Sequence, residues 1–260
     1  MKKWIILVLG LGLINQCFSA CAAVNEKTEA EHAMVFSVNG SVKVVPYGSN
    51  VGVKCSKGML LHAGDWVKTA PNSSVTVAFD KAAENVITIE EDSLIVIKLD
   101  GYFKVQLLRG EIYAILENVG KDETFRVLTP SVVTESLNSG WGAASDGSYT
   151  NVVVFDNRVY VCGINETGTA DDKKYWIEEG FQRKTITFED PGKVESAPES
   201  TLSWFKDQVV AHHLSQASLS EEQASSRQEE NDTTTEGKLK PANNKKLDLV
   251  EYLYKQRLKS

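Results

Sequence analysis

The side chains able to act in catalysis or metal binding are few and scattered in this chain. Its four histidines, His32, His62, His212 and His213, form no HExxH pattern and stand at no zinc-finger spacing from a cysteine. The sequence also contains no phosphate-binding glycine loop, no dinucleotide fingerprint and no nucleophile elbow. It therefore predicts no metal site, no cofactor and no catalytic residue of these kinds.

Carboxylates cluster at Glu90-Glu91-Asp92 and at Asp171-Asp172. Two carboxylates facing across a cleft perform glycoside hydrolysis, and alternating oxygen ligands around a glycine bend bind calcium. Contiguous acids in turns suit neither arrangement, so we expect them to be solvated. An envelope enzyme that acts on glycans or peptidoglycan through Glu91 or Glu111 is the alternative, and it requires two carboxylates that converge in a cleft.

The charge balance bears on the partners of the chain. Its 260 residues contain 28 Lys and Arg against 35 Asp and Glu, a formal net charge of −7, and the isoelectric point is near 5.3. A nucleic-acid binder needs a basic surface to displace counterions, so we expect no nucleic-acid partner. An apolar content of 42% is that of an ordinary globular protein.

The N-terminal residues resemble an export signal. Two lysines precede an uncharged run rich in Ile, Leu and Val, and small residues follow at 19–23. Residues 1–20 are therefore expected to be a signal peptide, which places the chain in the periplasm or at the outer membrane. Cys21 follows the sequence Phe18-Ser19-Ala20, which resembles a lipobox. Lipidation of Cys21 and ordinary cleavage remain alternatives.

Cys55 and Cys162 are the cysteines inside the expected body. In an oxidising compartment the two thiols could form a disulfide that closes a loop of about 100 residues. The alternative is two buried thiols that act as small apolar side chains.

Residues 33–190 read as an all-β domain. β-branched and polar residues alternate in short runs, and the pairs Asn39-Gly40, Asp100-Gly101 and Asp156-Asn157 have the composition of tight hairpin turns. The unbroken apolar run 94–97 predicts a strand that is covered on both faces. Several aromatic side chains offer a sugar-stacking face, although aromatic residues in β domains are more often core: Trp141, Tyr149, Tyr160, Tyr175 and Trp176.

The composition changes after Pro191. A short helix is expected at 200–214, a disordered linker at 215–246 and an amphipathic helix at 247–260. The last helix could bind a partner groove, lie on a membrane surface or fold back onto the β domain.

Six segments of the β region, in this order, resemble the FecR domain: Val38-Asn39-Gly40-Ser41-Val42-Lys43-Val44, Gly64-Asp65-Trp66-Val67-Lys68-Thr69, Ser73-Ser74-Val75-Thr76-Val77-Ala78-Phe79, Glu91-Asp92-Ser93-Leu94, Leu108-Arg109-Gly110-Glu111-Ile112-Tyr113 and Phe125-Arg126-Val127-Leu128-Thr129-Pro130. The resemblance spans about residues 35–188. Where the family carries Arg-Gly-Thr, this chain departs with Leu137-Asn138-Ser139-Gly140-Trp141-Gly142.

The resemblance implies a compact all-β fold, a stacked-strand solenoid or sandwich, and no enzymatic activity. It implies a structural turn at Gly64, Asp65 and Thr69, in which the carboxylate accepts backbone N–H bonds. Regulatory members of the family respond to an outer-membrane receptor and control a sigma factor through a cytoplasmic segment. Since we expect a signal peptide and no later membrane span here, the resemblance favours an exported scaffold, sensor or binding module. Its partner would be an envelope protein or a cell-wall polymer, with membrane attachment through Cys21 or the last helix.

Overall fold

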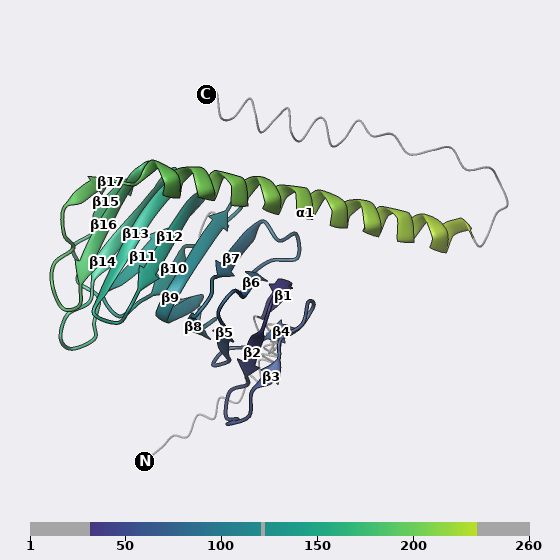
Figure 1. Cartoon of the computed structure of the whole chain (residues 1–260), viewed down its shortest axis with the longest axis horizontal. Coiled ribbons are helices and arrows are strands. Elements are labelled where there is room, and N and C mark those ends of the chain that lie inside the picture. The colour runs from purple at the N-terminus through teal and green to yellow at the C-terminus, as the bar shows by residue number, and fades with distance from the viewer. Residues whose placement is uncertain (1–31, 121–122, 233–260) are drawn as a thin grey trace, which may run out of the picture. The chain divides into compact units, whose positions relative to one another are not determined.

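The computed structural model describes residues 32–120 and 123–232, with side chains of the C-terminal helix described to residue 218. The expected signal peptide, Cys21, residues 233–246 of the expected linker and the expected helix 247–260 lie outside the described residues. Strands β1 to β17 follow one another along the body, and helix α1 runs across them (Figure 1).

The strands form two sheets that share β9, so the all-β expectation is confirmed. Sheet A contains, in spatial order, β4 (Leu60–Leu61), β1 (Ala33–Asn39), β6 (Ser74–Ala78), β7 (Asn85–Ile89), the second half of β9 (Val105–Leu116), β12 (Ser139–Ser145), β13 (Tyr149–Asp156), β16 (Phe181–Ile186) and β17 (Val194–Ser196). Sheet B contains β3 (Val53–Lys54), β2 (Val42–Val45), β5 (Trp66–Thr69), β8 (Leu94–Ile97), the first half of β9, β10 (Phe125–Leu128), β11 (Val132–Ser136), β14 (Arg158–Gly163) and β15 (Tyr175–Glu178).

Strand β9 crosses from sheet B to sheet A at Gly110. Before this glycine β9 pairs with β8 and β10, and after it β9 pairs with β7 and β12. Gly110 has a φ of 97°, and a Cβ there would lie 2.2 Å from Ser93 Oγ. The Ser93 hydroxyl accepts the N–H of Glu111 at 2.9 Å. A side chain at residue 110 would therefore displace the group that holds the crossing.

The same corner is built a second time between β1 and β2. Gly40 has a φ of 72°, and a Cβ there would lie 2.4 Å from Ser73 Oγ. The Ser73 hydroxyl accepts the N–H of Ser41 at 2.9 Å. Asn72 and Asp92, which precede the two serines, both have a φ of 53°. Two distant segments thus use one construction to turn the chain from one sheet to the other.

Two of the three turns expected to form hairpins instead connect strands of different sheets. Strands β1 and β2 join through Asn39-Gly40, and β13 and β14 through Asp156-Asn157, yet the members of each pair lie in different sheets. Both dipeptides do form tight turns, but a turn of this composition also suits a chain that passes from one sheet to the other. Asp100-Gly101 does join an antiparallel pair, β8 and β9.

The main core lies between the sheets and is filled by Val, Ile and Leu side chains from both. In β8, Ile95 and Ile97 enter this core, whereas Leu94 and Val96 are half-buried on the other face. The expectation that run 94–97 is covered on both faces is therefore wrong, because its outward face meets solvent in part.

A Cys55–Cys162 disulfide is absent, since both thiols are free and buried. Cys55 continues β3 by donating its N–H to Val42, and Cys162 lies on β14. The order of sheet B places β2, β5, β8, β9, β10 and β11 between them. Seven strand spacings amount to about 34 Å measured across the sheet, far beyond the reach of a disulfide.

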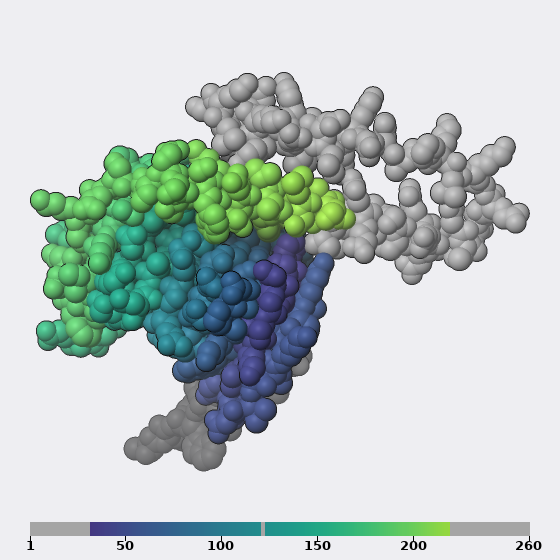
Figure 2. Space-filling view, viewed as in Figure 1, coloured from purple at the N-terminus to yellow at the C-terminus, as the bar shows by residue number. Residues whose placement is uncertain are grey.

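The first part of helix α1 (Glu199–Asp232) packs on the outer face of sheet A. Figure 2 shows the helix lying along one side of the β body. Phe205 stacks on Phe155 with ring centroids 3.8 Å apart, and it is 2% exposed. Strand β12 makes room for these aromatic side chains. A Cβ on Gly140 would meet the Phe205 ring at 2.9 Å, and one on Gly142 would meet Tyr113 at 2.9 Å. The departure from the family pattern at 137–142 thus supplies the glycines against which the helix packs.

The helix is longer than expected, which corrects two boundaries. It does not end at residue 214 but continues to Asp232, so the expectation of disorder is wrong for residues 215–232. Low apolar content indicated little packing there, but the Ala, Gln and Glu residues of this stretch favour helical backbone without a core. No helix within residues 32–232 combines the length and apolar character that a membrane span requires.

Replacement of Gly110 by alanine should destabilise the crossing of β9. Gly58 is the matched control, because it also has a positive φ, 82°, but a Cβ there would contact nothing within 4 Å. Both variants incur backbone strain of about 1–2 kcal/mol, and Gly110→Ala adds overpacking of roughly 1–3 kcal/mol. Urea unfolding of the two variants measures the difference, and equal losses would contradict this account of the corner.

Phe205→Ala should release the first part of α1 from sheet A. Removing a buried phenylalanine costs about 3–5 kcal/mol, and this loss falls on the contact between the helix and the sheet. Amide hydrogen exchange of residues 201–216 should accelerate strongly. Leu214→Ala on the same helix is the control, since Leu214 is 45% exposed and should change stability by less than about 0.5 kcal/mol.

Candidate interaction surface

The strands of the two sheets differ in charge. Those of sheet A contain three acids, Glu111, Asp156 and Glu195, and two cations, Arg183 and Lys184. Those of sheet B contain two acids, Glu135 and Glu178, and six cations: Lys43, Lys54, Lys68, Arg109, Arg126 and Arg158. The six cations lie on the outward face of sheet B, which is therefore basic although the chain is acidic.

Four of these cations form a row across neighbouring strands, which we call the lysine row. Lys43 on β2 is in register with Lys54 on β3 and with Lys68 on β5. Lys68 is in register with Leu94, which is in register with Arg109. All four cationic side chains are exposed, and among the described residues no carboxylate lies within ion-pair distance of them.

A row of apolar and neutral side chains lies beside the lysine row on the same face. Val45, Trp66, Val96 and Gln106 are successive register partners on β2, β5, β8 and β9. Trp66 is two residues from Lys68, so both side chains point outward, and Trp66 is 44% exposed. An indole is thus presented to solvent directly beside a line of positive charges.

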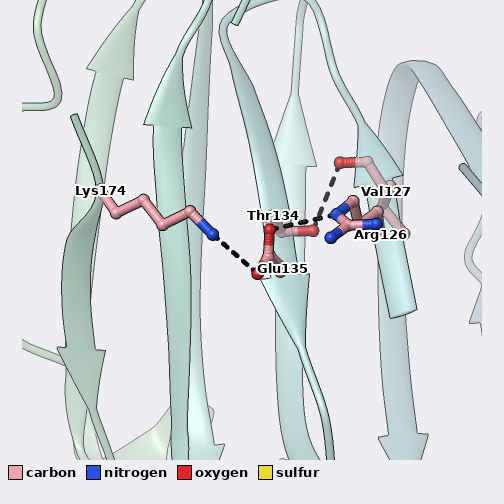
Figure 3. Close-up of polar contacts among 5 residues, drawn as sticks. All are labelled: Arg126, Val127, Thr134, Glu135 and Lys174. Carbon is pink, nitrogen blue, oxygen red and sulfur yellow. Dashed lines mark hydrogen bonds and ion pairs between the residues drawn. The ribbon is translucent and has the colours of Figure 1, made fainter. Parts of the chain in front are cut away.

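A third row crosses the other half of sheet B and contains an ion-pair network (Figure 3). Glu135 accepts hydrogen bonds from Arg126 Nε at 3.1 Å and from Lys174 Nζ at 2.8 Å. Burial alone would raise the pKa of Glu135, but these two cations outweigh that effect and hold the pKa below its usual value. Beneath them, the Thr134 hydroxyl donates to the Val127 carbonyl at 3.4 Å.

Aromatic side chains continue this third row. Glu135 is in register with Tyr160, which is in register with Trp176. The Arg158 guanidinium lies 4.2 Å from the Trp176 ring centroid, and Arg126 lies 4.4 Å from that of Tyr102. Stacking on aromatic rings fixes the long cationic side chains in place, so this part of the surface is ordered as well as charged.

The sugar-stacking residues expected from the sequence are only partly brought together. Tyr160 and Trp176 are neighbours on the outer face of sheet B. Trp141 is fully buried in the core and donates its indole N–H to Ser136 Oγ at 3.1 Å. Tyr175 packs toward the core, and Tyr149 lies on sheet A beneath Lys184. Sequence reasoning missed Trp66 and Tyr102, whose exposure depends on strand register.

In the expected turn at Gly64, Asp65 and Thr69, the side chains of Asp65 and Thr69 accept hydrogen bonds from backbone N–H groups. Asp65 Oδ1 accepts the N–H of Tyr47 and Oδ2 accepts the N–H of His62, each at 2.9 Å. Thr69 Oγ1 accepts the N–H of Ser93 at 2.9 Å. These side chains tie β5 to its neighbours and take part in no surface site.

A cavity of about 210 Å³ lies between α1 and the outer face of sheet A. Glu90, Tyr113 and Trp204 line it. The pKa of Glu90 is raised, chiefly by burial and also by the charges of Glu111 and Glu91. The pKa of Tyr113 is raised by burial and by its hydrogen bond to Glu111.

The two carboxylates of the enzyme alternative have different partners. Glu111 accepts the hydroxyl of Tyr113 next to the cavity, whereas Glu91 accepts the N–H of Asn72 at 2.5 Å on an exposed corner. Glu90 rather than Glu91 lines the cavity with Tyr113. Among the described residues, Glu90, Glu111 and Tyr113 are therefore the ionisable groups that come together at this cavity.

Residues 65–160 match the family model described as FecR protein, which confirms the resemblance for this part of the chain. No curated protein matches. The solved structures that are similar include two described as a candidate anti-sigma factor from Parabacteroides distasonis ATCC 8503. The one at 1.65 Å resolution has 11% identity, a TM-score of 0.42, and coverage of 54% of this chain and 64% of that chain. The one at 2.50 Å has 13% identity, a TM-score of 0.31, and coverage of 63% and 61%. The match thus spans less than two thirds of either structure.

Docking of α1 should weaken in acid. His212 is 8% exposed, its Nε2 lies 3.0 Å from the Ala83 carbonyl, and burial lowers its pKa below 6.5. The unfolded chain takes up this proton near pH 6.5, so the stability that the neutral ring contributes is present above that pH and is lost as the pH falls below it. The neighbouring His213 Nε2 lies 2.9 Å from Glu117 Oε1.

Amide exchange of residues 201–216, corrected for intrinsic rates and compared at pH about 7.5 and about 5, measures this effect. His212→Gln keeps a donor for Ala83 but cannot be protonated, so it should flatten the pH dependence. An unchanged dependence in this variant would assign the effect to another group.

Proposed function

We propose that this chain is a non-enzymatic, exported FecR-like module of the bacterial envelope that binds its partner, an envelope protein or a cell-wall polymer, through the outer face of sheet B. The observation that carries the proposal is the arrangement of cations and aromatic rings across this face. Because the face is broad and its polar groups lie in rows, it suits binding better than catalysis, which needs groups converging on one reacting atom.

The FecR match at residues 65–160 supports a regulatory, non-catalytic role. The matched region includes β5, β8, β9, β10 and β11 of sheet B, and with them Lys68, Arg109 and Arg126. Helix α1 packs on part of sheet A, over Phe36, Ile115 and Phe155. The cations and aromatic rings of sheet B are exposed or half-buried in the described body and so are accessible to a partner.

A photoreactive residue placed at Trp66 or at Trp176 in producing cells should cross-link to one partner, because both side chains are exposed on this face. A residue placed at Ile186, which is 49% exposed on sheet A, is the matched control and should not capture that partner. Mass spectrometry of the captured chain also reads the mature N-terminus and the state of Cys21. Capture from the control position alone would overturn the proposal.

The cavity beside α1 supports one second candidate, an enzyme that acts on envelope glycans, because Glu90 has a raised pKa beside Glu111 and Tyr113. Purified chain incubated with cell-wall fragments should leave their length unchanged. Shortening that disappears in Glu111→Gln, with Glu91→Gln retained as the exposed control, would favour the enzyme over the binding module.

A further inference from the structure

The geometry points to an anionic polysaccharide as the ligand of the outer face of sheet B, with the lysine row contacting its acidic groups and Trp66 stacking on a sugar ring. This inference rests on the proposed binding function and specifies the class of partner.

The first argument is charge complementarity. Lys54, Lys43 and Lys68 lie side by side and Arg109 lies one strand beyond Leu94, without an ion-paired carboxylate among the described residues, in a chain whose net charge is −7. Like charges in adjacent register positions repel one another, so the row is unfavourable by itself. A polyanion relieves this repulsion and steers toward the row even though the whole protein is acidic.

The second argument is spacing. The lysine row runs across the strands, so neighbouring positions are separated by about 4.8 Å, which is close to the length of one sugar unit in an extended chain. Lys54, Lys43 and Lys68 occupy three consecutive positions and Arg109 the fifth. A polymer with one acidic group per sugar would therefore meet successive cations along its length.

The third argument is the exposed aromatic ring beside the charges. Trp66 is a register partner of Val45 and Val96, and its indole is 44% exposed beside the lysine row. The apolar face of a pyranose ring packs on an indole, and Trp, with one polar N–H, suits a surface that is partly apolar and partly wet. An anionic membrane also accepts an indole at its headgroup level, so the linear spacing of the cations, rather than the ring alone, favours the glycan.

The experiment uses the full chain as it is exported and a fluorescent oligogalacturonate of about ten units, which carries one carboxylate per sugar. The chain should bind it, with affinity that falls as salt is raised. The triple variant Lys43→Gln, Lys54→Gln, Lys68→Gln should bind about tenfold or more weakly. Trp66→Ala should also bind more weakly at unchanged salt dependence.

The matched control is Lys81→Gln, Lys184→Gln, Lys193→Gln, which removes the same charge from sheet A and its loops. It should bind like the unmodified chain, and thermal unfolding of both triples should show that each is folded. Neutral dextran of equal length should not bind. Equal losses in the two triples would overturn the inference, because net charge rather than the row would then explain binding.

Vesicles of phosphatidylglycerol separate a membrane from a glycan. Binding to vesicles but not to oligogalacturonate overturns the inference, as does binding to neither. If neither binds while the cross-link from Trp66 captures a protein, the glycan inference fails and the proposed binding function stands. If the oligosaccharide is bound and shortened, the non-enzymatic function itself fails.

Discussion

The crossing of β9 at Gly110 is the constraint on which the rest of the structure depends. A single twelve-residue strand supplies a central member of both sheets, so the two sheets share one backbone and cannot slide past each other. The crossing needs a residue with positive φ and no Cβ, and it needs Ser93 to hold the next N–H. The Gly40–Ser73 corner repeats the device near the N-terminal end of the described body.

The outward-facing side chains of the two sheets differ in composition. On sheet A the side chains Phe36, Ile115 and Phe155 are apolar, and they require a cover, which Phe205 and its neighbours on α1 provide. On sheet B the outward positions carry six lysines and arginines, two glutamates and exposed aromatic residues beside half-buried apolar residues such as Leu94 and Val96. The outer face of sheet A thus packs against α1, and the outer face of sheet B is the one we propose to contact a partner.

The position of α1 also depends on a detail of β12. Gly140 and Gly142 flank the buried Trp141, and the absence of their side chains leaves space for the Phe205 and Tyr113 rings. Strand β12 is therefore fully packed on its inner face, through Trp141, while its two glycines leave space for other side chains on its outer face. His212 completes the docking by placing a neutral ring against the Ala83 carbonyl, so the helix is held by polar as well as apolar contacts.

The sequence by itself determined the all-β class, the FecR resemblance and the chemistry of the turns, because alternation of Val and Ile with polar residues and the Gly-Asp and Asp-Ser turns are local signals. It did not determine which strands pair. Asn39-Gly40 joins two sheets and Asp100-Gly101 joins two partners in one sheet, although the two dipeptides carry the same local signal.

The candidate surface was decided only by the tertiary structure. Lys43, Lys54, Lys68 and Arg109 are spread over 67 positions of the chain, and register across β3, β2, β5, β8 and β9 brings them into one row. Trp141 and Trp176 looked alike in the sequence, yet one is buried and one is exposed, because the inward or outward direction of a strand residue follows from pairing and not from its type. The separation of Cys55 from Cys162 has the same cause, since strand order is a long-range property.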